Sequence, residues 1–165
     1  MLFSIEPSWD YGVVLRSSLE LARDGSLTDT AYFSRYPFQV YPLLYMTFFM
    51  KLIHARTMAA ACGVIYVLNI IHILVALYGA FFVGKLLHGK RFGLKILLFC
   101  MCSAPLFLYA SICYTDTLAL PFPVWTLALW LYARKMPALT KQQKWKKTAL
   151  YVGSCLLYTS PSPRD

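Results

Sequence analysis

Long apolar runs without a charged residue make up most of the chain beyond position 56. Thr57–Gly84 contains 28 such residues, Ile96–Thr115 contains 20, and Thr117–Ala133 contains 17. A helix needs about 20 apolar residues to cross the hydrocarbon core of a bilayer, and about 17 is the lower limit. The pattern therefore predicts an all-α, polytopic membrane protein with three complete transmembrane helices. A further apolar run begins at Thr148 and predicts a truncated fourth span.

The segment before these runs has shorter and more polar patterns. Between Tyr11 and Asp24, apolar residues recur at helical spacing and charged residues occupy the other face, which predicts an amphipathic helix on the membrane surface. Asp10 is expected at its N-cap and Gly25 at its C-terminal stop. Phe38–Met50 is also apolar, but its thirteen residues include Pro42 and are too few to span a bilayer. We expect it to form an interfacial or re-entrant helix.

The composition supports an integral membrane protein. Hydrophobic residues make up 59% of the chain and charged residues 14%, whereas a soluble domain carries about 25% charged residues. The net charge of +9 could suggest a nucleic-acid partner. The basic residues instead gather in short loops beside apolar runs, as cytoplasmic membrane flanks do, so we expect no nucleic-acid partner. The cysteines lack the spacing of a metal site or of a redox motif.

Two loops between the predicted spans are strongly basic and predict the topology. Lys85–Lys95 and Arg134–Lys147 together hold ten Lys and Arg residues and no acid. An even number of predicted crossings separates these loops, so both would face the cytoplasm of a multi-pass protein in the cell membrane. If Phe38–Met50 does not span, residues 1–56 and Asp116 lie on the non-cytoplasmic side. If it spans, the N-terminal segment falls on the cytoplasmic side instead.

Both ends of the chain have unusual sequences. Residues 155–165 match an in-frame translation of a transposon-based sequencing adapter, so the native part is expected to end near Ser154. Met1–Ile5 is apolar but far too short to span. It is expected to be the tail of a missing first transmembrane helix, or part of a tail that is translocated directly. The predicted organisation is an external segment over residues 1–56, followed by transmembrane helices over 57–154.

Three residues are candidates for chemistry at the membrane surface. Asp116 lies between two apolar runs, and a carboxylate near membrane depth is either functional or marks a wet hairpin turn. Asp10 suits a helix N-cap, or a general base that deprotonates an acceptor. Arg35 stands among aromatic residues, where its fork suits a phosphate at headgroup level or simply reaches the interface.

Four short motifs suggest a family when they are taken together. They are Trp9-Asp10-Tyr11, Leu21-Ala22-Arg23-Asp24-Gly25, Tyr32-Phe33-Ser34-Arg35-Tyr36-Pro37 and Tyr114-Thr115-Asp116. An external acid ahead of an amphipathic helix, then an aromatic-basic-proline element and a second external Asp, resembles the GT-C glycosyltransferases. The branch it is similar to contains protein O-mannosyltransferases and the bacterial lipid A aminoarabinose transferases. The resemblance covers nearly the whole native stretch.

The resemblance implies inverting transfer of a sugar from a polyprenyl-phosphate-linked donor to an extracytoplasmic glycan, lipid or protein. Asp10 would be the catalytic base, and Asp116 a second acid that shapes the site. Arg35 would contact the donor phosphate, although it stands where the family has Lys. Substrate binding would also involve the neighbouring tyrosines of these motifs. Those residues are Tyr11, Tyr36 and Tyr114.

Neither a cofactor nor a metal ligand set follows from the residues. The resemblance leaves a divalent metal open, because Tyr11 stands where some members carry a second acid. Two other classes of protein fit the same hydropathy. A transporter or lipid flippase would place acids near mid-membrane, and a non-catalytic membrane protein would not depend on Asp10 or Asp116.

Overall fold

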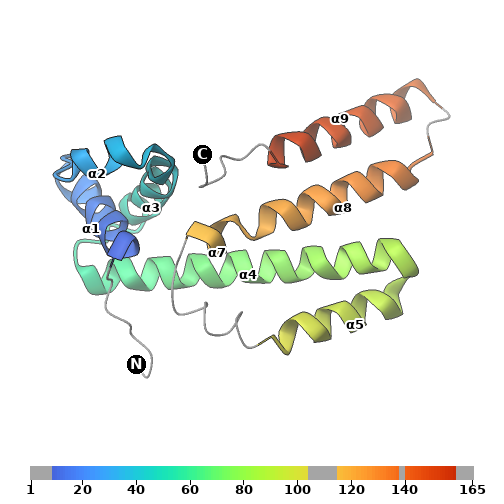
Figure 1. The fold of residues 1–165 in the computed structure, drawn as a ribbon, viewed down its shortest axis with the longest axis horizontal. Helices are drawn as coiled ribbons and strands as arrows, with labels where there is room; N and C mark the ends of the chain where they lie inside the picture. The colour runs from blue at the N-terminus through green and yellow to red at the C-terminus, as the bar shows by residue number, and fades with distance from the viewer. Residues whose placement is uncertain (1–8, 104–114, 138–139, 159–165) are drawn as a thin grey trace. The chain divides into compact units, whose positions relative to one another are not determined.

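The described residues of the computed structural model are 9–103, 115–137 and 140–158, and they form helices joined by short turns, with no β-strand among them (Figure 1). The predicted all-α class is therefore confirmed for this part of the chain. The fold divides into two compact units. The first is built mainly on the chain up to Ile70, and the second on the chain from Ile71 onward, so the longest helix contributes to both.

The first unit is a cluster of short helices that leads into the long one. Gly25 follows the first helix with a φ of 69°, which confirms its predicted place at the C-terminal stop. The prediction that Asp10 is the N-cap is wrong. The helix already includes Trp9, so Asp10 lies in its first turn. The elements are α1 (Trp9–Arg23), α2 (Thr30–Arg35), η1 (Pro37–Gln39), α3 (Val40–Leu52) and the start of α4 (Met58–His88).

Helices α1 and α3 pack through small and hydroxyl side chains. The buried Ser18 hydroxyl donates hydrogen bonds to the carbonyl oxygens of Val14, at 2.7 Å, and of Leu43, at 3.3 Å. The Thr47 hydroxyl donates in return to the carbonyl oxygen of Ser18 at 3.3 Å. Such hydroxyl bonds across a close helix contact are common between helices in membranes. They fix the register of α1 against α3.

Helix α3 exposes an apolar stripe on the side away from this contact. Tyr41, Leu44, Phe48 and Leu52 follow helical spacing along one face, and all four are exposed. The helix has 13 residues, which at 1.5 Å per residue gives about 20 Å, shorter than a hydrocarbon core of about 30 Å. Its bounds agree with the predicted short apolar helix over Phe38–Met50. The stripe suits a helix that lies in a membrane interface.

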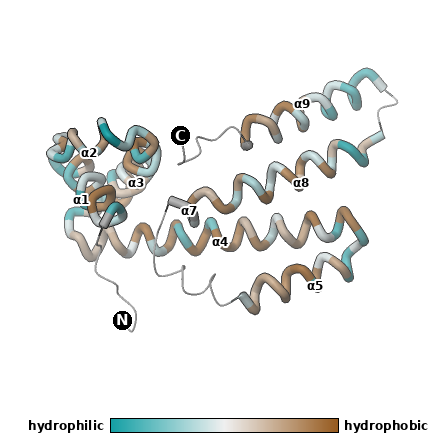
Figure 2. The backbone as a smooth tube through the Cα atoms, in the orientation of Figure 1, coloured by the Kyte–Doolittle hydropathy of each residue, from teal (hydrophilic) through white to brown (hydrophobic). Residues whose placement is uncertain are grey.

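Helix α4 has 31 residues and is long and apolar enough to cross a membrane. It is the one such helix within the described part of the chain. The Thr57 hydroxyl accepts a hydrogen bond from the Ala60 N–H at 3.3 Å and so caps its start. Figure 2 shows the predominance of hydrophobic residues along the helix. Several of its apolar side chains are exposed at helical spacing, namely Val67, Ile70, Ile71, Leu74 and Tyr78.

The second unit corrects the bounds of the later predicted spans. The run predicted to span at 117–133 is not one helix, because Pro121, which lacks a backbone N–H, starts a new one after a break at Leu120. The run at 96–115 belongs to a helix that begins earlier, at Lys90, and residues 104–114 lie outside the described residues. The helices of this unit, besides the later part of α4, are α5 (Lys90–Met101), α7 (Thr115–Ala119), α8 (Pro121–Lys135) and α9 (Lys141–Tyr158).

The last helix also begins before the apolar run that predicted it at Thr148. Thr140 and Gln143 form a capping box, in which each side chain accepts a hydrogen bond from the other residue's backbone N–H, at 3.1 and 3.2 Å. The helix therefore starts at Lys141, inside the basic loop. Hydropathy misses this start because the cap depends on hydrogen bonds rather than on apolar character.

The two basic loops lie at the same end of the second unit. Trp125 donates to the carbonyl oxygen of Val75 at 3.0 Å, and Lys135 donates to the carbonyl oxygen of Leu86, so α4 and α8 run parallel. Lys147, from the start of α9, donates to the carbonyl oxygen of Met136 at 3.3 Å. The C-terminal ends of α4 and α8 therefore meet where α5 and α9 begin.

Candidate functional site

The parallel packing of α1 and α3 brings the start of α1 level with the start of α3. Ser18 lies beside Leu43 and Thr47, and Ala22 and Met50 line one pocket farther along. In each of these pairs the residue on α3 follows its partner on α1 by a similar number of positions, so the two helices run in the same direction. Asp10 precedes Ser18 on α1, and at this register the residues of the other helix that lie level with Asp10 are those of η1, just before α3. Asp10 is therefore level with the turn that follows Arg35.

Asp10 is an exposed carboxylate in the first turn of α1. The next residue, Tyr11, is half-buried against the helix cluster. The fold therefore presents the Asp10 carboxylate to the surrounding medium from a helix whose other face is fixed in the core.

Arg35 ends α2, where its guanidinium group lies over the ring of Tyr36, with 5.8 Å from Cζ to the ring centroid. Both residues are exposed. The Tyr36 ring in turn contacts Tyr32 and Phe38, with centroids 5.1 and 6.1 Å away. Stacking on an aromatic ring leaves the N–H groups at the edge of the guanidinium free to meet an anion. The aromatic cluster thus holds Arg35 at the same end of the helix pair as Asp10.

Two other predicted site residues, Tyr114 and Asp116, do not belong to the described part of the first unit. Tyr114 lies outside the described residues. The backbone of Asp116 is part of α7, in the second unit. The structure does not describe its side chain. The pairing of Asp10 with Asp116 therefore stays a prediction.

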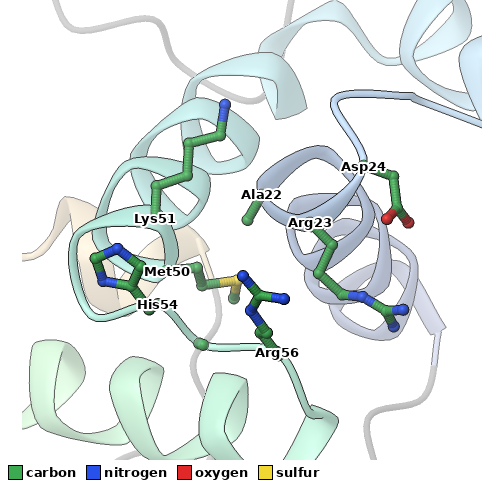
Figure 3. Close-up of a pocket in the computed structure, with 8 residues that line it drawn as sticks. Ala22, Arg23, Asp24, Met50, Lys51, His54 and Arg56 are labelled. Carbon is green, nitrogen blue, oxygen red and sulfur yellow. The ribbon is translucent and has the colours of Figure 1, made fainter.

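A pocket at the opposite end of α1 and α3 was missed by the sequence analysis. Its volume is about 400 Å³, and it lies where both helices end (Figure 3). Basic residues, with His54 included, make up half of its lining. Spacing in the sequence gave no signal, because these residues come from two separated segments, 22–24 and 50–56, that only packing brings together. The lining residues are Ala22, Arg23, Asp24, Met50, Lys51, His54, Ala55 and Arg56.

Among residues 9–103, 115–137 and 140–158, no group of three His, Cys, Asp or Glu side chains lies close enough together to hold a metal ion. No family model matches the chain, and no curated protein or solved structure matches it either. Function therefore rests on the residues and on their geometry.

Proposed function

We propose that this chain is the N-terminal part of an integral membrane glycosyltransferase that uses a polyprenyl-phosphate-linked sugar donor. The observation that carries the proposal is the register of α1 and α3, which brings the Asp10 end of α1 level with the turn after Arg35. A base and an anion-binding group are the two functions that such a transfer requires. Both come from the group of short helices that precedes the membrane-crossing candidate α4 in the chain.

The proposed topology is multi-pass, with α1, α2 and α3 on the non-cytoplasmic surface. The exposed apolar stripe of α3 supports a position at the interface, because burying it in lipid removes apolar surface from water. Both basic loops lie at one end of the second unit, as two loops on the cytoplasmic side would. Shorter helices such as α8 would then cross together with neighbouring segments rather than alone.

The proposed reaction needs few groups from the protein. Asp10 accepts the proton of an acceptor hydroxyl or amine as that group attacks the sugar carbon, and the lipid phosphate departs with inversion at that carbon. Arg35, stacked on Tyr36, holds the departing phosphate at headgroup depth. Tyr11 and Tyr114 border the substrate, and Asp116 completes the site from the second loop. Positioning of the two substrates provides much of the rate advantage.

The test uses protein expressed from the full reading frame that carries this sequence, reconstituted in lipid nanodiscs. Asp10→Asn keeps the shape of the side chain and removes the base, so transfer from a polyprenyl-phosphate sugar should fall by about a hundredfold or more. Arg35→Gln should mainly raise KM for the lipid donor, because it removes a phosphate contact.

Arg16→Gln provides the matched control, because Arg16 is an exposed arginine on α1 and lies farther along that helix than Asp10. Its kinetics should equal those of the wild-type protein. Transfer at the wild-type rate by the Asp10→Asn protein would refute the proposed base. It would leave a transporter or a non-catalytic membrane protein as the better description.

A further inference from the structure

The pocket at the C-terminal ends of α1 and α3, called the basic pocket below, has more positive than negative charge. Its lining contains three cations and one acid, namely Arg23, Lys51, Arg56 and Asp24. The formal excess is therefore two positive charges, with His54 counted as neutral. In the part of the chain that the structure describes, none of the three cations makes an ion pair or a side-chain hydrogen bond. The pocket therefore offers donors that have no protein acceptor.

The close-up in Figure 3 shows how these groups are arranged. Lys51, Asp24 and Arg23 project away from the space between the two helices, whereas Arg56 reaches over Met50 from the connection that leads to α4. Met50 is fully buried and forms the floor. Arg56 thus stands over an apolar base, with Arg23 and Lys51 elsewhere in the lining, an arrangement that suits a phosphate attached to a less polar group.

The end of α3 has a backbone feature that places His54 at the rim. The Ala55 N–H bonds the carbonyl oxygen of Met50 at 2.9 Å, and the His54 N–H bonds that of Lys51 at 3.2 Å, which together form a Schellman motif. Glycine usually occupies the left-handed position of this motif. His54 occupies it here with a φ of 55°. A residue with an imidazole side chain thus stands where a glycine would be less strained.

The basic pocket is also close to the expected membrane surface. The uncharged run Thr57–Gly84 has 28 residues, which as a helix are about 42 Å long. This length matches a bilayer including its headgroup regions, about 40–45 Å. Arg56 directly precedes the run, so it lies at the depth of lipid phosphates when α4 crosses the membrane.

We infer that the basic pocket is a phosphate-binding site, separate from the end of α1 that carries Asp10. Arg23 follows Asp10 by thirteen residues on one helix, so their main chains are about 20 Å apart. A phosphate in the basic pocket is therefore too far from Asp10 to be the group released in the proposed transfer. The phosphate belongs either to a lipid headgroup or to a small soluble phosphate ester, and the experiment separates these two sources.

The experiment uses the full chain in nanodiscs of phosphatidylcholine. Glycerol 3-phosphate is titrated by calorimetry in one arm, and phosphatidic acid is included in the nanodisc and its retention measured by native mass spectrometry in the other. Arg56→Gln and Arg23→Gln should each weaken binding about tenfold, as expected for the loss of one charge-assisted contact. Arg16→Gln, the same change at an exposed site outside the pocket, should leave binding unchanged.

Each outcome decides the inference. Arginine-dependent binding of glycerol 3-phosphate supports a site that takes soluble phosphate esters, and arginine-dependent retention of phosphatidic acid alone supports a lipid headgroup site. Binding of neither probe overturns the inference. An equal loss with Arg16→Gln also overturns it, because the attraction would then be diffuse rather than local. Sugar transfer is not measured, so the inference and the proposed function fail independently.

Discussion

The strained position of His54 leads to a prediction in which a glycine makes the protein more stable. A residue with a Cβ pays about 1–2 kcal/mol in the left-handed region, which glycine avoids. Glycine also gives the unfolded chain more freedom, which costs about 0.5–1 kcal/mol. The imidazole is exposed and has no hydrogen bond among the described residues, so its loss costs little. His54→Gly should therefore stabilise the protein by about 0.5–1 kcal/mol.

The assay is thermal unfolding of the full chain in detergent micelles, followed by circular dichroism. A gain of about 1 kcal/mol corresponds to a rise in Tm of roughly 2–4 °C for a chain of this size. The control is His54→Ala, which removes the imidazole but keeps the Cβ, so the strain at φ 55° remains. Its Tm should not exceed that of the wild-type protein.

The comparison of the two variants separates backbone strain from side-chain function. Both variants should bind glycerol 3-phosphate more weakly if the imidazole contributes to the basic pocket. A lower Tm for His54→Gly than for the wild-type protein would refute the reasoning, because the imidazole would then contribute more to stability than its backbone conformation costs. Equal Tm values for the Gly and Ala variants would refute the assigned strain.

Two further predictions concern the packing of the second unit. Gly93→Ala should destabilise the protein by about 1–3 kcal/mol, because a Cβ there would lie 2.6 Å from the carbonyl oxygen of Phe81. The control is Gly63→Ala, at a helical glycine where an added Cβ meets nothing within 4 Å. In the same thermal unfolding assay this control should not be destabilised. Trp125→Phe should cost about 1 kcal/mol in urea unfolding, because it removes the indole hydrogen bond to Val75. A Gly93→Ala protein as stable as the Gly63→Ala protein, or an unchanged midpoint for Trp125→Phe, would contradict these contacts.

The sequence by itself determined the helices whose signals are local. The absence of charge over Thr57–Gly84 predicted the long helix α4, and a short apolar run predicted α3. Gly25 ended α1 as expected, because a left-handed residue at that position favours glycine whatever the helix packs against. Such signals depend on neighbours in the chain, so they can be read without knowing the fold.

Helix bounds were less predictable where hydropathy and hydrogen bonding disagree. Helix α9 starts at a capping box inside a basic loop, and Pro121 divides the run that predicted one span at 117–133. Helix α5 likewise extends back to Lys90, directly after Gly89, whose φ is 87°. Charged residues end an apolar run but do not end a helix, so the predicted bounds fell short.

Only the tertiary structure decided which residues share a site. Arg23 and Arg56 lie 33 positions apart in the sequence, and no periodicity relates them; they line one pocket because Ser18 and Thr47 fix α1 parallel to α3. The same register brings Asp10 level with the turn after Arg35 and keeps both away from the basic pocket. The physical reason is that a helix–helix register depends on contacts between distant segments, whereas helix formation depends on local ones.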